Sequence, residues 1–245
     1  MNPFGGKFPD LQHMLRLAYS VYRRFKSRFL TWAVAGWKYD APIHPFQLYW
    51  VNPSDIKYIQ DRSGEVNDYP YYVSEVKGGS WDELVIPVDE HDFFESFELH
   101  FNNEINWQET PWVNRAISEI EEDGLVLYGC ESEEEFQKRL ADIDQLYNAI
   151  RKYGYKTQRE LIRTDDDLRH DWARFCPELH EIVVNIGRDG RFIFEDGWHR
   201  FAIARVLDLS EVPIRINIRH NKWQSYRFDG ITRSTDELDI DHPDL

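Results

Sequence analysis

The sequence has little cysteine, little positive charge and no long apolar run, and each of these shortages argues against a class of protein. The two cysteines of its 245 residues, Cys130 and Cys176, show no pairing pattern, which argues against a disulfide-stapled secreted domain. No apolar run approaches the roughly 20 residues that cross a bilayer, and no cleavable signal peptide is apparent. A formal net charge of -15 argues against broad, non-specific binding of nucleic acid, which needs a basic surface. These features lead us to expect a cytoplasmic protein.

What the sequence does contain is a strand, turn and helix signature in its C-terminal third. Residues 181–186 and 192–194 read as apolar strands joined by Asp189–Gly190, a dipeptide that tight hairpin turns favour because they need positive φ. A helix is expected over residues 198–207, and residues 212–218 alternate apolar and polar as a half-buried strand does. A glycine, a histidine and an arginine therefore lie where the chain is expected to turn from a strand into a helix.

This turn has the composition of an anion site. Gly197 lets a phosphate approach the backbone, and the N–H groups and dipole at the start of the helix attract negative charge. His199 and Arg200 can add charge-assisted hydrogen bonds. The plainer alternative is a strand-to-helix turn with exposed polar side chains, because short glycine motifs are weak signals.

The segment Gly197-Trp198-His199-Arg200, followed by an apolar helix and by Val212-Pro213-Ile214, resembles the ParB/sulfiredoxin superfamily. Members carry a Gly-x-[His/Arg]-Arg turn ahead of a helix, and then a strand that Val-Pro or Ile-Pro often opens. The resemblance is strongest over residues 181–223 and extends faintly, with insertions, over residues 50–223. It implies an α+β fold in which helices pack on a small mixed sheet.

In that superfamily the turn binds nucleotide phosphates: CTP in ParB, ATP in sulfiredoxin, and ADP or ATP in a related free-serine kinase. The resemblance therefore implies that Gly197, Trp198, His199 and Arg200 bind a nucleotide or its phosphates. Asp196 matches an acidic residue that precedes the glycine in many members, the kinase included. Trp198 stands where sulfiredoxin has its catalytic cysteine, which argues against peroxiredoxin repair.

The sequence also departs from the family pattern in two places. The helix that offers Lys, Ser and Thr to the nucleotide in sulfiredoxin has Asp142, Gln145 and Ala149 at the aligned positions. About 22 residues follow Trp223, which is too short for the helix-turn-helix region of a chromosome-partition ParB. A role in DNA partition is therefore disfavoured.

The chain is expected to contain one main domain with an extension at each end. Residues 1–45 are predicted to form a basic amphipathic helix and a linker that contains prolines. Residues 46–224 would form the α+β domain, with a helical insertion at about 89–153, and residues 225–245 an acidic tail. The basic helix is expected to dock on its own acidic domain; contact with a membrane surface or a protein partner is the alternative.

Several polar residues outside the turn could extend the site. A double-glycine loop presents a tryptophan and an acid, and the tryptophan could stack on a base, although a packed surface turn explains the same pattern. Arg219 and His220 end the last predicted strand. Gln158 follows residues 146–150, which faintly resemble a helix of ParB. The possible extension comprises Trp81, Asp82, Gln158, Arg219 and His220.

No metal site is predicted from side chains alone. His91, Glu95 and His100 lie close in sequence, but the spacing of the two histidines is not the one-turn pair of a zinc-protease helix. Magnesium held through nucleotide phosphates is more plausible, because Mg²⁺ needs few protein ligands and keeps several waters.

Three functions from different classes remain open. The first is a phosphotransferase or NTP hydrolase that uses ATP or another nucleotide, with or without Mg²⁺, and an unknown acceptor. In that case Asp196 and His199 are the catalytic candidates, with Asp82 and Glu98 as other acids, because phosphoryl transfer needs mainly positioning and electrostatics. The second is a nucleotide-switched module that binds a protein partner. The third is a non-catalytic scaffold.

Overall fold

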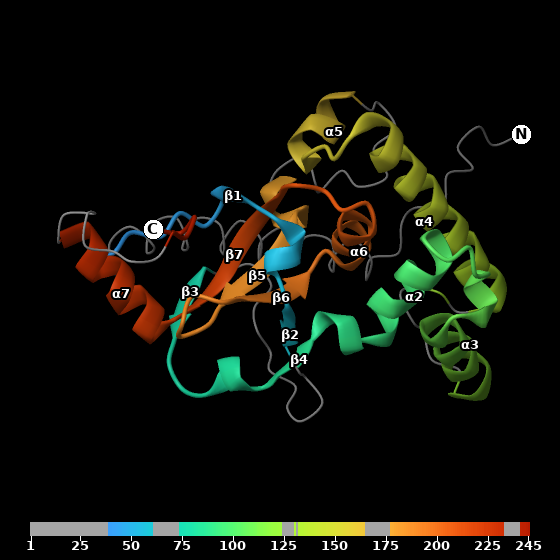
Figure 1. Cartoon of the computed structure of the whole chain (residues 1–245), viewed down its shortest axis with the longest axis horizontal. Coiled ribbons are helices and arrows are strands. Elements are labelled where there is room, and N and C mark those ends of the chain that lie inside the picture. Colours follow the sequence, from blue (N-terminus) through green and yellow to red (C-terminus); the bar gives the residue numbers. More distant parts are fainter. Residues whose placement is uncertain (1–38, 61–73, 124–129, 131, 165–176, 233–240) are drawn as a thin grey trace, which may run out of the picture.

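The protein is described here by a computed structural model that covers residues 39–60, 74–123, 130, 132–164, 177–232 and 241–245 (Figure 1). The basic helix expected near the N-terminus and Cys176 lie outside these ranges. In the described part, six α-helices accompany a seven-stranded mixed sheet, which confirms the predicted α+β class.

The sheet has parallel and antiparallel pairs in one layer. Its strand order is β1-β7-β5-β6-β2-β4, and β3 pairs with β7 beyond the end of β1. The pairs β5–β7, β2–β6 and β3–β7 are parallel, and the others are antiparallel. The strands are β1 (Leu48–Val51), β2 (Tyr58–Gln60), β3 (Glu75–Lys77), β4 (Val85–Pro87), β5 (Ile182–Ile186), β6 (Phe192–Asp196) and β7 (Val212–His220).

The predicted hairpin is present as β5, a tight turn and β6. The turn closes through a hydrogen bond from the Gly190 N–H to the Gly187 carbonyl (3.1 Å), and Gly190 has the positive φ of +88° that its composition indicated. The β7 strand differs from the expectation of a half-buried strand, because all nine of its residues are buried. Its polar face, which includes Arg219, is covered by protein rather than by solvent.

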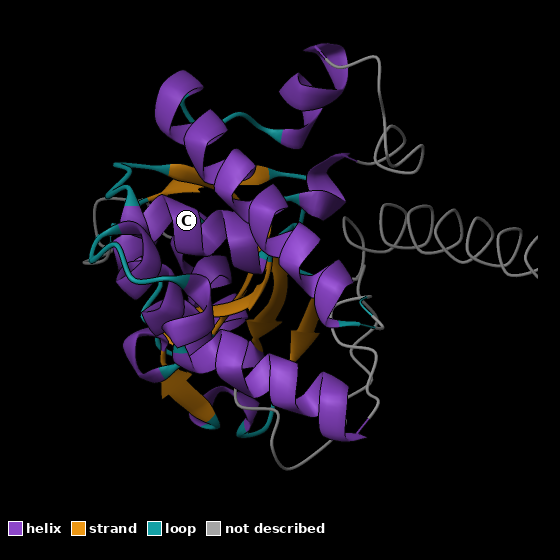
Figure 2. Cartoon of the chain, turned by 90° about the vertical axis from the view of Figure 1, so that its right-hand side faces the viewer, coloured by secondary structure: helices purple, strands orange, loops and turns teal. Residues whose placement is uncertain are grey.

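Helices pack on both sides of this sheet. Figure 1 shows α7 on one side of the strands, and α6 on the other side between the strands and a group of helices. Seen from that second side, the helices lie in front of the strands (Figure 2). The helices are α2 (Asp92–Phe101), α3 (Pro111–Asp123), α4 (Glu133–Tyr153), α5 (Gln158–Thr164), α6 (Trp198–Val206) and α7 (Asn221–Thr232).

Helices α2, α3 and α4 lie within residues 89–153, where helices were expected, and are together called the helical insertion. Ser132 is the N-cap of α4, since its Oγ accepts a hydrogen bond from the Glu135 N–H (3.3 Å), as in the capping box Ser-x-x-Glu. Both α2 and α4 contact α6, so the insertion packs on the helix that follows the glycine turn. Aromatic side chains fill its core: Phe93, Phe97, Trp107, Trp112 and Phe136 are all buried. In the described part of the chain, no helix is long and apolar enough to cross a membrane.

The C-terminal segment differs from the acidic tail expected over residues 225–245. Residues up to Thr232 belong to α7, and Asp244 is buried in the core with only 3% of its surface exposed. Its carboxylate accepts hydrogen bonds from Arg219 Nε (2.9 Å) and Trp223 Nε1 (2.9 Å), and Arg227 Nε lies 3.1 Å from Oδ2. The buried arginines need this negative charge, which explains why the segment docks.

The ionisation of Asp244 fits this role. Burial by itself raises the pKa of a carboxyl, but the hydrogen bonds and charge of Arg219, with the charge of Arg227, outweigh it and hold the pKa of Asp244 below its usual value. Arg219 therefore belongs to this C-terminal cluster.

Replacing Asp244 with alanine should lower the free energy of unfolding by about 3 kcal/mol, because it leaves two buried guanidinium groups without their carboxylate. Urea denaturation followed by circular dichroism measures the change. Asp241→Ala is the matched control, since this exposed carboxylate lies in the same segment and its loss should change stability by less than about 0.5 kcal/mol. Equal stability of the two variants would contradict the role of Asp244.

Candidate functional site

The glycine turn between β6 and α6 can be formed only by glycine. Gly197 has φ +91°, and a Cβ atom at this position would stand 2.9 Å from the Cα of Ile182 on the neighbouring strand. Asp196 supports the turn, since its Oδ1 accepts a hydrogen bond from the Gly197 N–H (2.7 Å). Gly197 is the N-cap of α6 and provides no capping side chain, so the N–H groups of the first helical turn stay available for solvent or a ligand.

These N–H groups adjoin a pocket of about 670 Å³. This volume lies within the range of roughly 300–1,000 Å³ that is usual for small-molecule sites. Part of the lining comes from the β6–α6 turn and the start of α6, and the rest from residues 91–146. The lining residues are His91, Phe93, Arg115, Arg139, Leu146, Asp196, Gly197, Trp198, His199 and Arg200.

His199 is held in this pocket as a neutral imidazole. Its ring packs edge-on against Phe93, with the ring centroids 5.7 Å apart. Burial, and next the positive charge of Arg139, lowers the pKa of His199 to about 4. Within the described residues, the buried Nε2 atom has no hydrogen-bond partner. His199 is therefore a neutral residue in the lining of the pocket that carries one unsatisfied ring nitrogen.

Trp198 forms the aromatic part of the pocket. Its ring stacks on Phe94 at a centroid distance of 5.5 Å and lies 5.2 Å from the ring of His91. His91 in turn caps α2, because its Nδ1 accepts a hydrogen bond from the Phe93 N–H (3.2 Å). The wall thus offers flat apolar surface beside the polar start of α6.

Arg200 is already engaged by the protein. Its Nη1 donates to Glu181 Oε2 (2.8 Å), its Nη2 donates to the Lys156 carbonyl, and its guanidinium lies 4.2 Å from the centre of the Tyr155 ring. Glu181 is buried and also accepts a hydrogen bond from the backbone N–H of Gln158 (2.6 Å). Arg200 and Gln158 therefore meet at Glu181, where they tie α6 to the start of β5 and to α5.

Two further arginines line the pocket, and they differ in whether a carboxylate pairs with them. Arg115 pairs with Asp92 (Nε to Oδ2, 2.7 Å) and with Glu119 (Nη1 to Oε1, 3.2 Å). Arg139 pairs with no carboxylate among the described residues, and its buried Nε has no hydrogen-bond partner there. Within the described part of the chain, Arg139 thus lines the pocket without a carboxylate partner.

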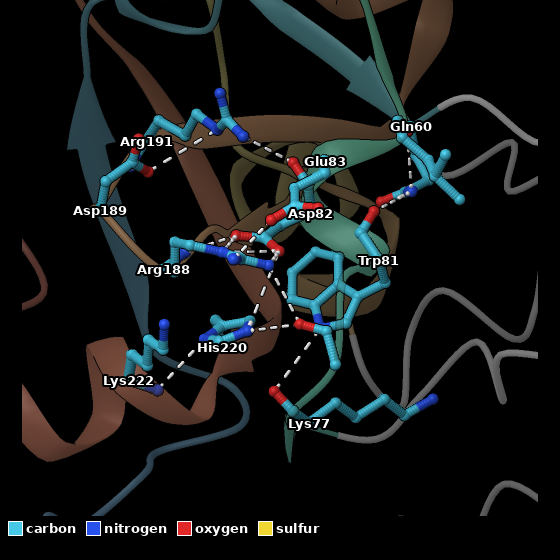
Figure 3. A network of polar contacts seen from close by, with 12 residues as sticks. Gln60, Lys77, Trp81, Asp82, Glu83, Arg188, Asp189, Arg191, His220 and Lys222 are labelled. Atoms are coloured by element: carbon cyan, nitrogen blue, oxygen red, sulfur yellow. Dashed lines mark hydrogen bonds and ion pairs between the residues drawn. The ribbon is translucent and has the colours of Figure 1, made fainter.

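Trp81 and Asp82 lie in a separate network, shown in Figure 3. Asp82 is fully buried and accepts hydrogen bonds from Arg188 through Nε (2.9 Å), Nη2 (2.7 Å) and the backbone N–H (2.8 Å). Burial raises the pKa of Asp82, but the hydrogen bonds from Arg188 prevail and lower it to about 2. Asp82 is therefore a fixed carboxylate that holds the β5–β6 turn.

His220 belongs to the same network. Its Nε2 lies 3.0 Å from the Gly79 carbonyl, and its Nδ1 accepts a hydrogen bond from the Lys222 N–H (3.1 Å). Its ring lies 6.0 Å from that of Trp81. The network sits at the turn before β6, whereas the pocket follows the end of β6, so the length of the strand, roughly 15 Å, separates them.

The structure thus brings together one part of the predicted site and leaves the other part elsewhere. Residues 196–200 share the pocket. The predicted extension does not line it: Trp81, Asp82 and His220 form the network at the β5–β6 turn, Gln158 lies behind Arg200, and Arg219 pairs with Asp244. Glu98, the other candidate acid, hydrogen-bonds Asn102 on the exposed side of α2 (2.8 Å). Among the described residues, no group of His, Cys, Asp or Glu has the arrangement of a metal centre.

Sequence reasoning missed Arg139, although the sequence holds a signal for it. Phe136, Leu140 and Ile143 are buried and mark the apolar stripe of α4, and an arginine beside such a stripe is directed toward the interior. The sequence holds no such signal for the other residues that line the pocket from the helical insertion, because their position depends on how the insertion folds back over α6.

No protein-family model matches the chain, and no curated protein and no solved structure matches it either.

We expect His199 to titrate near pH 4 rather than near 6.5, which NMR of the imidazole signals can measure. Between these pH values the unfolded chain binds a proton that the folded protein does not. The free energy of unfolding should therefore fall by about 3 kcal/mol on this account as the pH drops from 6.5 to 4.

A His199→Phe variant should lose this part of the pH dependence, whereas substitution of the exposed His44 by glutamine should leave it unchanged. A midpoint of His199 near 6.5 would show that the imidazole is not buried against Arg139.

Proposed function

We propose that the protein binds a small molecule that carries phosphate, most simply a nucleotide, in the pocket in front of α6. The observation that supports this proposal is the uncapped start of α6 opening into a pocket of about 670 Å³ that also contains Arg139 and His199. An uncapped helix N-terminus attracts anions through its N–H groups and its dipole, and a guanidinium can add two parallel hydrogen bonds to a phosphate.

The dimensions and walls of the pocket favour a nucleotide over a bare ion. The volume exceeds what one phosphate group needs, and Trp198 and His91 supply flat surfaces against which a base can pack. The succession of β6, the glycine turn, α6 and β7 also follows the order that the ParB/sulfiredoxin resemblance implies. We therefore include a ParB/sulfiredoxin-like fold in the proposal.

For the chemistry, we propose phosphoryl transfer from the bound nucleotide to a hydroxyl or to water. Among the described residues, Asp196 is the carboxylate that lines the pocket, and it lies directly before α6 beside the proposed phosphate position. A carboxylate there can accept the proton of the attacking hydroxyl or meet Mg²⁺ carried by the phosphates. Positioning and electrostatic stabilisation supply most of the catalysis in such reactions.

A nucleotide-switched protein module remains the second candidate. The observation in its favour is that the pocket lies between α6 and the helices of the insertion, so that a ligand would contact both. Such a ligand could change how the insertion presents itself to a partner.

Calorimetric titration of the full chain with ATP, ADP and CTP, each with Mg²⁺, should show saturable binding of at least one nucleotide. The affinity should fall between low and high salt, because the interaction is largely electrostatic. Asp196→Asn should retain binding and slow the release or transfer of phosphate by at least about tenfold if Asp196 is the base.

Lys222→Ala is the matched control, since it removes an exposed cation at the distant end of the sheet and should leave binding unchanged. Failure of a well-folded protein to bind any of the nucleotides would reject the proposal and favour the scaffold hypothesis. Binding without phosphate release by the wild type would favour the switch.

A further inference from the structure

Arg139 differs from the other arginines that line the pocket, because no carboxylate pairs with it among the described residues. It lies on α4 next to the buried residues Phe136, Leu140 and Ile143, and its Nε is enclosed without a hydrogen-bond partner among the described residues. Its side chain lines the pocket together with His199, and its positive charge contributes to keeping that histidine neutral. An anion in the pocket would offset the charge of this partly buried guanidinium, which its Nη groups present without being enclosed as Nε is.

The two other arginines of the pocket are in a different state. Arg115 is held by Asp92 and Glu119, and Arg200 by the buried Glu181 and by a backbone carbonyl. A ligand phosphate that recruited Arg200 would have to leave Glu181 buried without its cation, which is strongly unfavourable. Moving Arg200 to a ligand would therefore cost an internal ion pair, whereas binding of a ligand by Arg139 would cost none among the described residues.

We infer that Arg139, rather than Arg200, holds the anionic group of the ligand against the start of α6. Arg200 is then a positioning residue, which fixes α6 on β5 through Glu181 so that the helix N-terminus faces the pocket. This inference rests on the proposed function and names the residue that carries the charge in it.

The assignment also defines the class of the ligand and its place. A guanidinium from α4 and helical N–H groups from α6 in the lining of one pocket suit a tetrahedral oxyanion, such as a terminal phosphate or a pyrophosphate. The anion would bridge α4 of the insertion and α6 of the sheet domain. Ligand binding should therefore slow amide hydrogen exchange in α4 as well as at the start of α6.

The test compares binding of inorganic pyrophosphate and of ADP by the full chain and its variants, measured by calorimetry. Arg139→Gln should weaken both at least tenfold without lowering the unfolding midpoint, because no internal ion pair is lost. Arg139→Lys should recover part of the affinity, since it restores the charge but not the planar fork. Lys138→Gln is the matched control: this neighbour is exposed and pairs with Glu134 (2.8 Å), and its loss should leave binding unchanged.

Arg200→Lys separates positioning from binding. It should lower the unfolding midpoint, and the folded variant should bind pyrophosphate within about threefold of the wild type, because the phosphate is not its partner. Equal binding by Arg139→Gln and wild type, or a greater loss in folded Arg200→Lys than in Arg139→Gln, would overturn the inference while leaving the proposed function intact. If the wild type binds neither pyrophosphate nor any nucleotide, the proposed function and the inference fall together.

Discussion

The close contact between Gly197 and β5 is the constraint on which the rest of the site depends. With φ at +91° and no room for a Cβ beside Ile182, the backbone can leave β6 and begin α6 at once. This places Arg200 one helical turn later, where it meets Glu181 at the start of β5. The close approach of Gly197 to Ile182 and the ion pair between Arg200 and Glu181 together fix the direction of α6. They thereby fix the position of its uncapped N–H groups.

The helical insertion turns this exposed helix start into a pocket. Its aromatic core packs against α6, and Phe93 lies edge-on to the ring of His199. The same packing brings Arg139 close enough to His199 to lower its pKa. Although the chain has a net charge of -15, Arg139 lies in the pocket without a carboxylate partner among the described residues, whereas Arg200 pairs with the buried Glu181.

The features that the sequence predicted correctly are those set by short-range interactions. Asp189–Gly190 specifies a hairpin because only a few residues adopt its backbone, and α6 begins directly after Gly197 as expected. Long-range charge pairs are different. Asp82 meets Arg188 across 106 positions, and Arg219 meets Asp244 across 25, so their partners depend on strand order rather than on any local pattern. For that reason Asp82, His220 and Arg219 could be recognised as unusual but not assigned to structural networks, and the docking of residues 241–245 was not foreseen.

The central claim is that an anion binds between α6 and α4. A crystal structure of the full chain soaked with ADP or pyrophosphate tests it most directly. The account predicts phosphate density within hydrogen-bond distance of the first N–H groups of α6 and of the Arg139 guanidinium, with the Arg200–Glu181 pair unchanged. Density at another surface, or phosphate bound to Arg200 with Glu181 released, would contradict it.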